Sequence, residues 1–129
     1  MFNVAAAPRV EAGFPSPAAD YTEKAMDLNR LVVKRPAATF FMRVVGGSMA
    51  GAGIADGDLV AVDRSIEPRE GDVVVAIVDG GFACKRLRRA GSGWALCSDG
   101  DGPVIAIDPE RGVEIWGVVG WSFKQHCHR

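Results

Sequence analysis

One stretch of the chain, residues 71–89, restricts the fold more than any other and reads GDVVVAIVDGGFACKRLRR. Two runs rich in strand-forming residues flank the tripeptide Asp79-Gly80-Gly81. An Asp-Gly pair between two such runs is the strongest short-range signal for a β-hairpin. The segment therefore predicts a sheet, and not a helix bundle, at the centre of this chain.

Four further stretches are typical of strands. They are rich in β-branched and aromatic residues, and turn residues separate them. Turn signals recur every 8–12 residues, with no long helical period between them. This pattern predicts a mainly β domain, curled or closed into a barrel-like shape. The four stretches are residues 39–45 (TFFMRVV), 56–63 (DGDLVAVD), 92–100 (SGWALCSDG) and 112–123 (GVEIWGVVGWSF).

The composition of the chain limits the classes of function that it can have. The 129 residues suit one compact domain, and a net charge of −1 gives no general attraction to nucleic acid or to anionic membranes. No apolar run approaches the roughly 20 residues that a membrane-spanning helix needs. Three cysteines without a Cys-x-x-Cys spacing indicate a reduced, cytoplasmic setting. No cofactor or metal is implied, because His126, Cys127 and His128 are too crowded in sequence to converge on one ion.

The N-terminal region differs from the rest of the chain. Residues 8–20, PRVEAGFPSPAAD, contain three prolines and show neither a helical nor a strand period. We therefore expect an extended arm over residues 1–28 and a β-rich domain over residues 29–129. Within the arm, Tyr21–Leu28 could form a short helix capped by Asp20.

Ser48 lies in a run of small residues, GGSMAGAG, directly after a predicted strand. A turn serine is one interpretation. The alternative is a nucleophile, but the α/β-hydrolase elbow requires glycine where Ala50 stands, and no lysine follows to make a phosphate-binding loop. A serine nucleophile also needs a base. The only two histidines lie in the last four residues of the chain, so lysine is the remaining candidate.

Lys85 is that candidate because of strand parity. Alternation places Ala83, Lys85 and Leu87 on one face of the predicted strand. If that face is buried, desolvation should lower the pKa of Lys85 and make its neutral amine a competent general base. The alternative is a solvated basic edge that continues through Arg86, Arg88 and Arg89. As a nucleic-acid patch this cluster is weak, because no aromatic residues are interleaved with it.

Together these motifs resemble the LexA/UmuD group of self-cleaving serine–lysine peptidases. GGSMAGAGIADGDLVAVD is followed by CKRL, with Lys85 standing 37 residues after Ser48. The arm, AGFPSPAADYTEKAMDLNRLVVKRPAATFF, extends the similarity from Ala12 to about Val119. The resemblance implies a β-rich fold in which Ser48 attacks the Ala12–Gly13 bond and Lys85 is the base. It departs from the family pattern at Ala12 itself, at Gly47 and in the shortness of the arm.

A small residue on each side of the bond and the proline-rich flank suit an extended substrate. We expect the backbone N–H groups of Ser48 and Met49 to hold the oxyanion. The resemblance further implies a homodimer, stimulation by a RecA filament on single-stranded DNA, and a trimmed product, starting at Gly13, that joins a Y-family (UmuC-like) polymerase for synthesis past DNA lesions. Only 12 residues precede the bond, so direct, sequence-specific DNA binding is not expected.

Two rival functions remain. One is a signal-peptidase-like enzyme acting on other proteins, which would call for a membrane anchor. The other is a non-catalytic polymerase accessory or dimerisation module with a vestigial serine and lysine. Raising the pH separates the second rival from a lysine-dependent peptidase, because a lysine base predicts faster self-cleavage, and no cleavage up to about pH 10 would favour the module. The tail from Trp121 to Arg129 has no interpretation from sequence.

Overall fold

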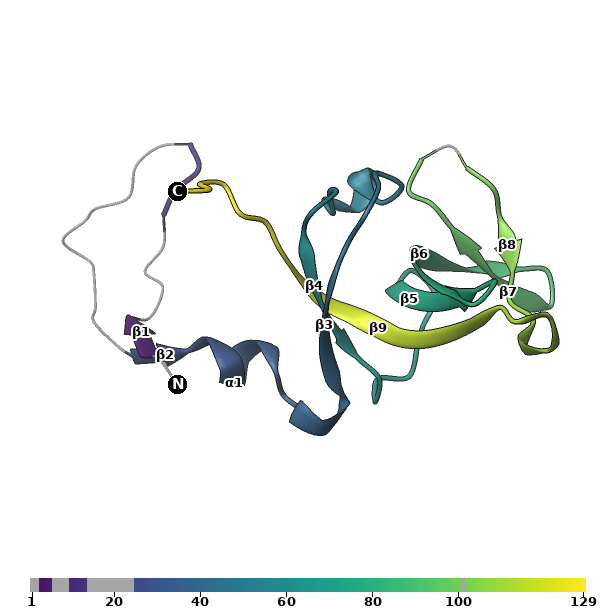
Figure 1. Ribbon diagram of the computed structural model, residues 1–129, viewed down its shortest axis with the longest axis horizontal. Helices are drawn as coiled ribbons and strands as arrows, with labels where there is room; N and C mark the ends of the chain where they lie inside the picture. Colours follow the sequence, from purple (N-terminus) through teal and green to yellow (C-terminus); the bar gives the residue numbers. More distant parts are fainter. Residues whose placement is uncertain (1–2, 6–9, 14–24, 101) are drawn as a thin grey trace. The chain divides into compact units, whose positions relative to one another are not determined.

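A computed structural model describes residues 3–5, 10–13, 25–100 and 102–129 of the chain. It divides into two compact units, Met1–Lys34 and Arg35–Arg129. Figure 1 follows the chain through both. Each unit is described by itself below.

The first unit contains a two-stranded antiparallel sheet and one short helix. Strand β1 (Asn3–Ala5) pairs with strand β2 (Ala25–Asp27), and helix α1 (Leu28–Val32) follows at once. The Asp27 carboxylate caps this helix by accepting from the N–H groups of Asn29 and Arg30. The predicted helix over Tyr21–Leu28 is therefore wrong at residues 25–27, which form a strand, whereas Leu28 is helical as the first residue of α1. Residues 21–24, and Asp20 as a cap, lie outside the described residues.

The second unit is built on one antiparallel sheet in the order β3-β4-β9-β5-β6-β7-β8. This confirms the predicted β-rich fold class, although β8 was not predicted. The strands are β3 (Thr39–Arg43), β4 (Leu59–Asp63), β5 (Val73–Val78), β6 (Gly81–Ala90), β7 (Gly93–Cys97), β8 (Ile105–Ala106) and β9 (Glu114–Phe123); short 3-10 helices cover Pro36–Ala38 (η2), Ala50–Ala52 (η3) and Pro109–Arg111 (η4).

The predicted hairpin at residues 71–89 is confirmed as β5 and β6. Val78 pairs with Gly81, which leaves Asp79 and Gly80 as a two-residue loop. Their φ angles are 50° and 80°. Positive φ at both central positions is the signature of a type I′ turn, whose twist matches that of the two strands. The Asp-Gly pair therefore fixes the register that carries every side chain of β6.

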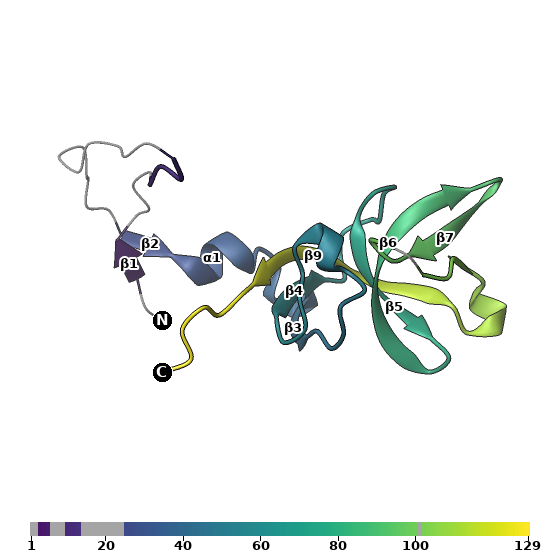
Figure 2. The ribbon, with the colours of Figure 1, turned by 90° about the horizontal axis from the view of Figure 1, so that it is seen from above.

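Strand β9 joins the two halves of this sheet. Its first half, up to Val118, pairs with β5, and its second half, from Val118 on, pairs with β4. Figure 1 and Figure 2 both show β3 and β4 towards one end of β9 and β5 to β7 towards the other. Two clusters of buried apolar residues form the core. One contains Val44, Met49, Ile54, Val60, Val62 and Val75, and the other Val74, Ala76, Leu87, Leu96, Val113 and Val118.

Gly117 allows β9 to pass close to β4, and this makes a testable prediction for stability. A Cβ at Gly117 would lie 2.6 Å from Cγ1 of Val62, a side chain with 0% exposure. Valine is stiff at χ1 and cannot yield easily. We expect Gly117→Ala to lower the free energy of unfolding by about 1–3 kcal/mol, as overpacked cores do. Urea denaturation measures it.

Gly120→Ala is the matched control on the same strand, because a Cβ at Gly120 meets no atom within 4 Å. This variant should stay within about 0.5 kcal/mol of the wild type, as substitutions away from such features do. Equal losses of stability in the two variants would contradict the proposed close approach at Gly117.

Candidate active site

Ser48 lies in a loop that the rest of the second unit holds in place. At the start of this loop Val44 donates its N–H to the Asp58 carbonyl at 2.8 Å, and Gly57 donates back to the Val44 carbonyl at 2.8 Å. Met49, the next residue after the serine, is only 1% exposed and packs in the core, whereas Ser48 is exposed. Burial of Met49 therefore anchors the loop and leaves the serine hydroxyl at the surface.

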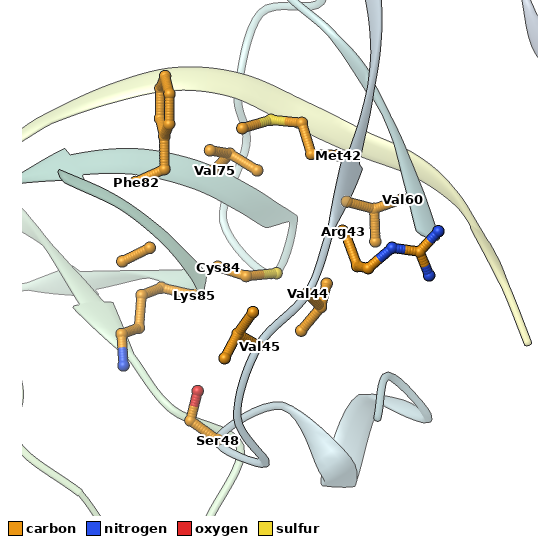
Figure 3. Close-up of a pocket in the computed structure, with 11 residues that line it drawn as sticks. Met42, Arg43, Val44, Val45, Ser48, Val60, Val75, Phe82, Cys84 and Lys85 are labelled. Atoms are coloured by element: carbon orange, nitrogen blue, oxygen red, sulfur yellow. The ribbon is translucent and has the colours of Figure 1, made fainter. Parts of the chain in front are cut away.

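Lys85 reaches the same place from β6, where it pairs with Val74 of β5. The lysine is half-buried, while Leu87, two residues further along the same face, is 1% exposed. Figure 3 shows the Lys85 amine and the Ser48 hydroxyl at the same side of the pocket, the lysine from the strand and the serine from the loop. The fold thus brings together the two residues that the sequence singles out, although 37 positions separate them.

A pocket of about 310 Å³ opens beside this pair. Most of its lining side chains are apolar, and Arg43, Ser48 and Lys85 are the polar ones (Figure 3). An apolar pocket next to a hydroxyl and an amine can receive a small apolar side chain and hold its backbone near both groups. The lining residues are Met42, Arg43, Val44, Val45, Ser48, Val60, Val75, Phe82, Ala83, Cys84 and Lys85.

Ser98 is a member of this site that sequence reasoning missed. Lys85 Nζ donates a hydrogen bond to Ser98 Oγ at 3.1 Å. Ser98 comes directly after β7, in the stretch SDG, which the sequence presents only as a turn. Strand β7 pairs with β6, but no sequence signal reveals which turn residue ends beside Lys85.

The next residue, Asp99, connects the site to the serine loop. Its N–H donates to the Ser48 carbonyl at 3.0 Å. Its carboxylate accepts from both Nε and a terminal nitrogen of Arg86, which also donates to the Gly71 carbonyl at 2.7 Å. This forked hydrogen bond from Arg86 holds the pKa of Asp99 below its usual range. Asp99 is therefore charged, fixed in place and bonded to the loop that carries Ser48.

Cys84, the residue before Lys85 on β6, also lines the pocket. Burial raises the pKa of its thiol, and the nearby Lys85 opposes this shift only in part. A thiol of that kind is a poor nucleophile at neutral pH. Cys84 is thus part of the apolar wall.

Asp58 anchors the base of the serine loop from the other side. It is a buried carboxylate that accepts from the Ala55 N–H at 2.8 Å and from Lys124 Nζ at 2.7 Å. The Ala55 N–H and the Lys124 ammonium lower the pKa of Asp58. Lys124, which the sequence leaves without a role, therefore neutralises a buried charge beneath the loop.

The predicted cleavage site belongs to the first unit. Ala12 and Gly13 are exposed, and a Cβ at Gly13 would meet no atom within 4 Å. Within the described part of the chain, neither the Ser48 N–H nor the Met49 N–H donates a hydrogen bond. Their assignment to an oxyanion stays a prediction.

Other chemistry finds little support among the described residues. His126 and His128 are exposed and lie beyond β9. No group of three or more histidine, cysteine or acidic side chains in the described ranges is arranged to hold a metal ion. None of the helices in those ranges has both the length and the apolar character to cross a bilayer.

Comparison with known proteins gives the context of this geometry. A sequence model of the family described as Peptidase S24-like matches residues 4–120. Protein MucA of Salmonella typhimurium is 43% identical over 119 residues, which cover 92% of this chain and 82% of MucA. Protein SamA of Salmonella typhimurium is 55% identical over 80 residues, covering 62% and 57% of the two chains.

The LexA repressor of Azoarcus sp. is also similar, with 47% identity over 83 residues that cover 64% of this chain and 41% of the repressor. The match to SamA likewise spans less than two thirds of that relative's length. The matches therefore cover only a part of SamA and of the LexA repressor, but most of MucA.

Proposed function

The chain belongs to the Peptidase S24-like family, and from that premise we propose that it is a self-processing serine–lysine peptidase. Ser48 is the nucleophile, Lys85 the general base, and the Ala12–Gly13 bond the substrate. The observation that carries the proposal is that the Ser48 hydroxyl and the Lys85 amine line the same pocket (Figure 3). In a family of peptidases, an amine close to a serine hydroxyl can serve as the base that takes the hydroxyl proton.

The reaction proceeds in two stages. The neutral Lys85 amine takes the Ser48 proton as Oγ bonds to the Ala12 carbonyl carbon. The N–H groups of Ser48 and Met49 stabilise the oxyanion. Protonated Lys85 then gives its proton to the Gly13 nitrogen, and the Ala12–Gly13 bond breaks. Water, activated by the same amine, hydrolyses the ester and regenerates Ser48.

The pocket supports the choice of bond. Its apolar wall accepts a side chain as small as that of Ala12 without leaving a buried polar group unpaired. Gly13 adds no side chain that would crowd the attacking oxygen. Both residues are exposed in the first unit, as a peptide substrate must be.

The biological setting follows from the UmuD-like relatives. We infer that cleavage is stimulated by a RecA filament on single-stranded DNA during the SOS response. The trimmed product, starting at Gly13, forms a homodimer in the cytoplasm and joins a UmuC-like, Y-family polymerase for synthesis past lesions. The similarity to MucA over 92% of the chain supports this setting. A vestigial accessory module is the alternative, and it makes no use of the Ser48–Lys85 pairing.

Intact-mass measurement tests the proposal directly. Wild-type protein and Ser48→Ala are incubated with a RecA filament on single-stranded DNA. Only the wild type should lose residues 1–12 and yield a product that begins at Gly13. Equal processing of Ser48→Ala would remove Ser48 as nucleophile. A wild type that stays intact, with the filament and at alkaline pH, would favour the accessory module.

A further inference from the structure

The turn after β7 contacts both members of the proposed Ser48–Lys85 pair. Ser98 accepts a hydrogen bond from Lys85 Nζ at 3.1 Å. The next residue, Asp99, donates its N–H to the Ser48 carbonyl at 3.0 Å. Two consecutive residues therefore bond to the base and to the nucleophile's own backbone.

This turn is itself held firmly. The Asp99 carboxylate pairs with Arg86, and the two side chains are only 16% and 20% exposed. Arg86 follows Lys85 on β6, so the pair attaches the turn to the same strand that carries the lysine. On its other side, Gly51 lies so close to Asp99 that a Cβ there would meet the Asp99 carbonyl oxygen at 3.0 Å. Ser98 is thus fixed between the lysine strand and the serine loop.

From this geometry we propose that Ser98 is a positioning residue for Lys85, an inference that rests on the proposed function. A lysine side chain rotates about four bonds, and its amine must present a lone pair to the Ser48 hydroxyl. A hydrogen bond from Nζ to Ser98 Oγ engages one N–H of the neutral amine and restricts where Nζ can lie. The lone pair then stays directed at Ser48.

The surroundings of Lys85 support a specific role for the Ser98 hydroxyl. Among the described residues the Lys85 side chain makes no other hydrogen bond, so Ser98 is the contact that orients it there. Neighbouring side chains of the pocket, Cys84 and Val45, are apolar or weakly polar and offer no comparable acceptor. Without Ser98, Nζ would be free to turn toward solvent.

The test compares full-length Ser98→Ala, Ser98→Thr and the wild type. Two rates are measured across a pH series: self-cleavage by intact mass, and covalent labelling of Ser48 by a small fluorophosphonate, which does not depend on the arm. Ser98→Ala should lower both rates roughly 10- to 100-fold, as misplacement of a catalytic group does. The loss should persist across the whole pH series, because Ser98 is proposed to act on the position of the amine and not on its charge. Ser98→Thr keeps the hydroxyl and should restore most of the rate.

Ser92→Ala is the matched control, since Ser92 is an exposed turn residue at the far end of the β6–β7 hairpin. It should behave as the wild type, and thermal unfolding should show all three variants folded. Wild-type rates in Ser98→Ala, or full recovery of that variant at high pH, would overturn the positioning role. If the proposed function itself is wrong, the result is different: the wild type does not cleave, or Ser48→Ala cleaves as well.

Discussion

Replacing Lys85 by alanine is expected to slow self-cleavage at Ala12–Gly13 by roughly 10²- to 10⁴-fold, the usual contribution of a general base. No other amine or imidazole among the described residues lines the pocket with Ser48. Wild-type cleavage should accelerate as the pH rises, because only the neutral amine can accept the serine proton. Lys85→Ala should stay slow up to about pH 10, near the ordinary lysine range. Intact mass against time at each pH gives both profiles.

Lys34→Ala is the control for this experiment. Lys34 is exposed and lies outside the second unit, so the change removes the same charge and the same side chain far along the chain from the site. It should leave the pH profile unchanged. A Lys85→Ala protein that still accelerates with pH like the wild type would show that another group, or hydroxide itself, takes the serine proton.

Gly51→Ala is expected to lower self-cleavage by about 100-fold, because displacements of about 1 Å in a catalytic geometry have effects of that size. A Cβ at Gly51 would lie 2.9 Å from the Cβ of Asp99 and 3.0 Å from its carbonyl oxygen. These are the Cβ and the backbone of Asp99, so rotation about a side-chain bond cannot move them away. The serine loop and the turn at Asp99 must separate, which strains the bond from the Asp99 N–H to the Ser48 carbonyl. Single-turnover cleavage and fluorophosphonate labelling of Ser48 measure the loss.

Gly47→Ala makes the same chemical change in the same loop, but a Cβ there meets no atom within 4 Å. We expect this variant to retain cleavage within about threefold of the wild type, since substitutions in open space are usually small in effect. Equal losses in Gly47→Ala and Gly51→Ala would mean that the loop needs glycine for chain flexibility, and that contact with Asp99 is not the cause.

Much of the sheet could be predicted because its signals are local. The Asp79-Gly80 turn sets the β5–β6 register, and that register in turn decides which face of β6 carries Lys85. Runs of β-branched residues mark the other long strands. The two-residue strand β8 carries too little pattern to be seen. The start of α1 was misplaced because Asp27, and not Asp20, is the residue that caps the described helix.

Only two individual residues of the candidate site, Ser48 and Lys85, could be predicted from the sequence. Failure of the histidine and phosphate-loop patterns left lysine as the base for Ser48, and strand parity selected Lys85. Its supporting contacts could not be predicted, since they depend on pairing between distant segments. Ser98 reaches Lys85 through the β6–β7 pairing, and Lys124 reaches Asp58 across 66 positions of sequence. Gly51 stands in the run of small residues around Ser48, and its lack of a side chain allows a close contact with Asp99 that the sequence does not reveal.

The place of β9 in the sheet has a consequence for the timing of activity in a newly made chain. Ser48 follows β3, which pairs with β4, while Lys85 lies on β6, which pairs with β5. Only β9 joins β4 to β5 in the sheet, and it is the last of these strands to be synthesised. A chain that stops short of Glu114 therefore has Ser48 and Lys85, the proposed nucleophile and base, next to strands that no sheet pairing joins. We therefore expect the proposed self-cleavage to begin only after β9 has paired with both β4 and β5.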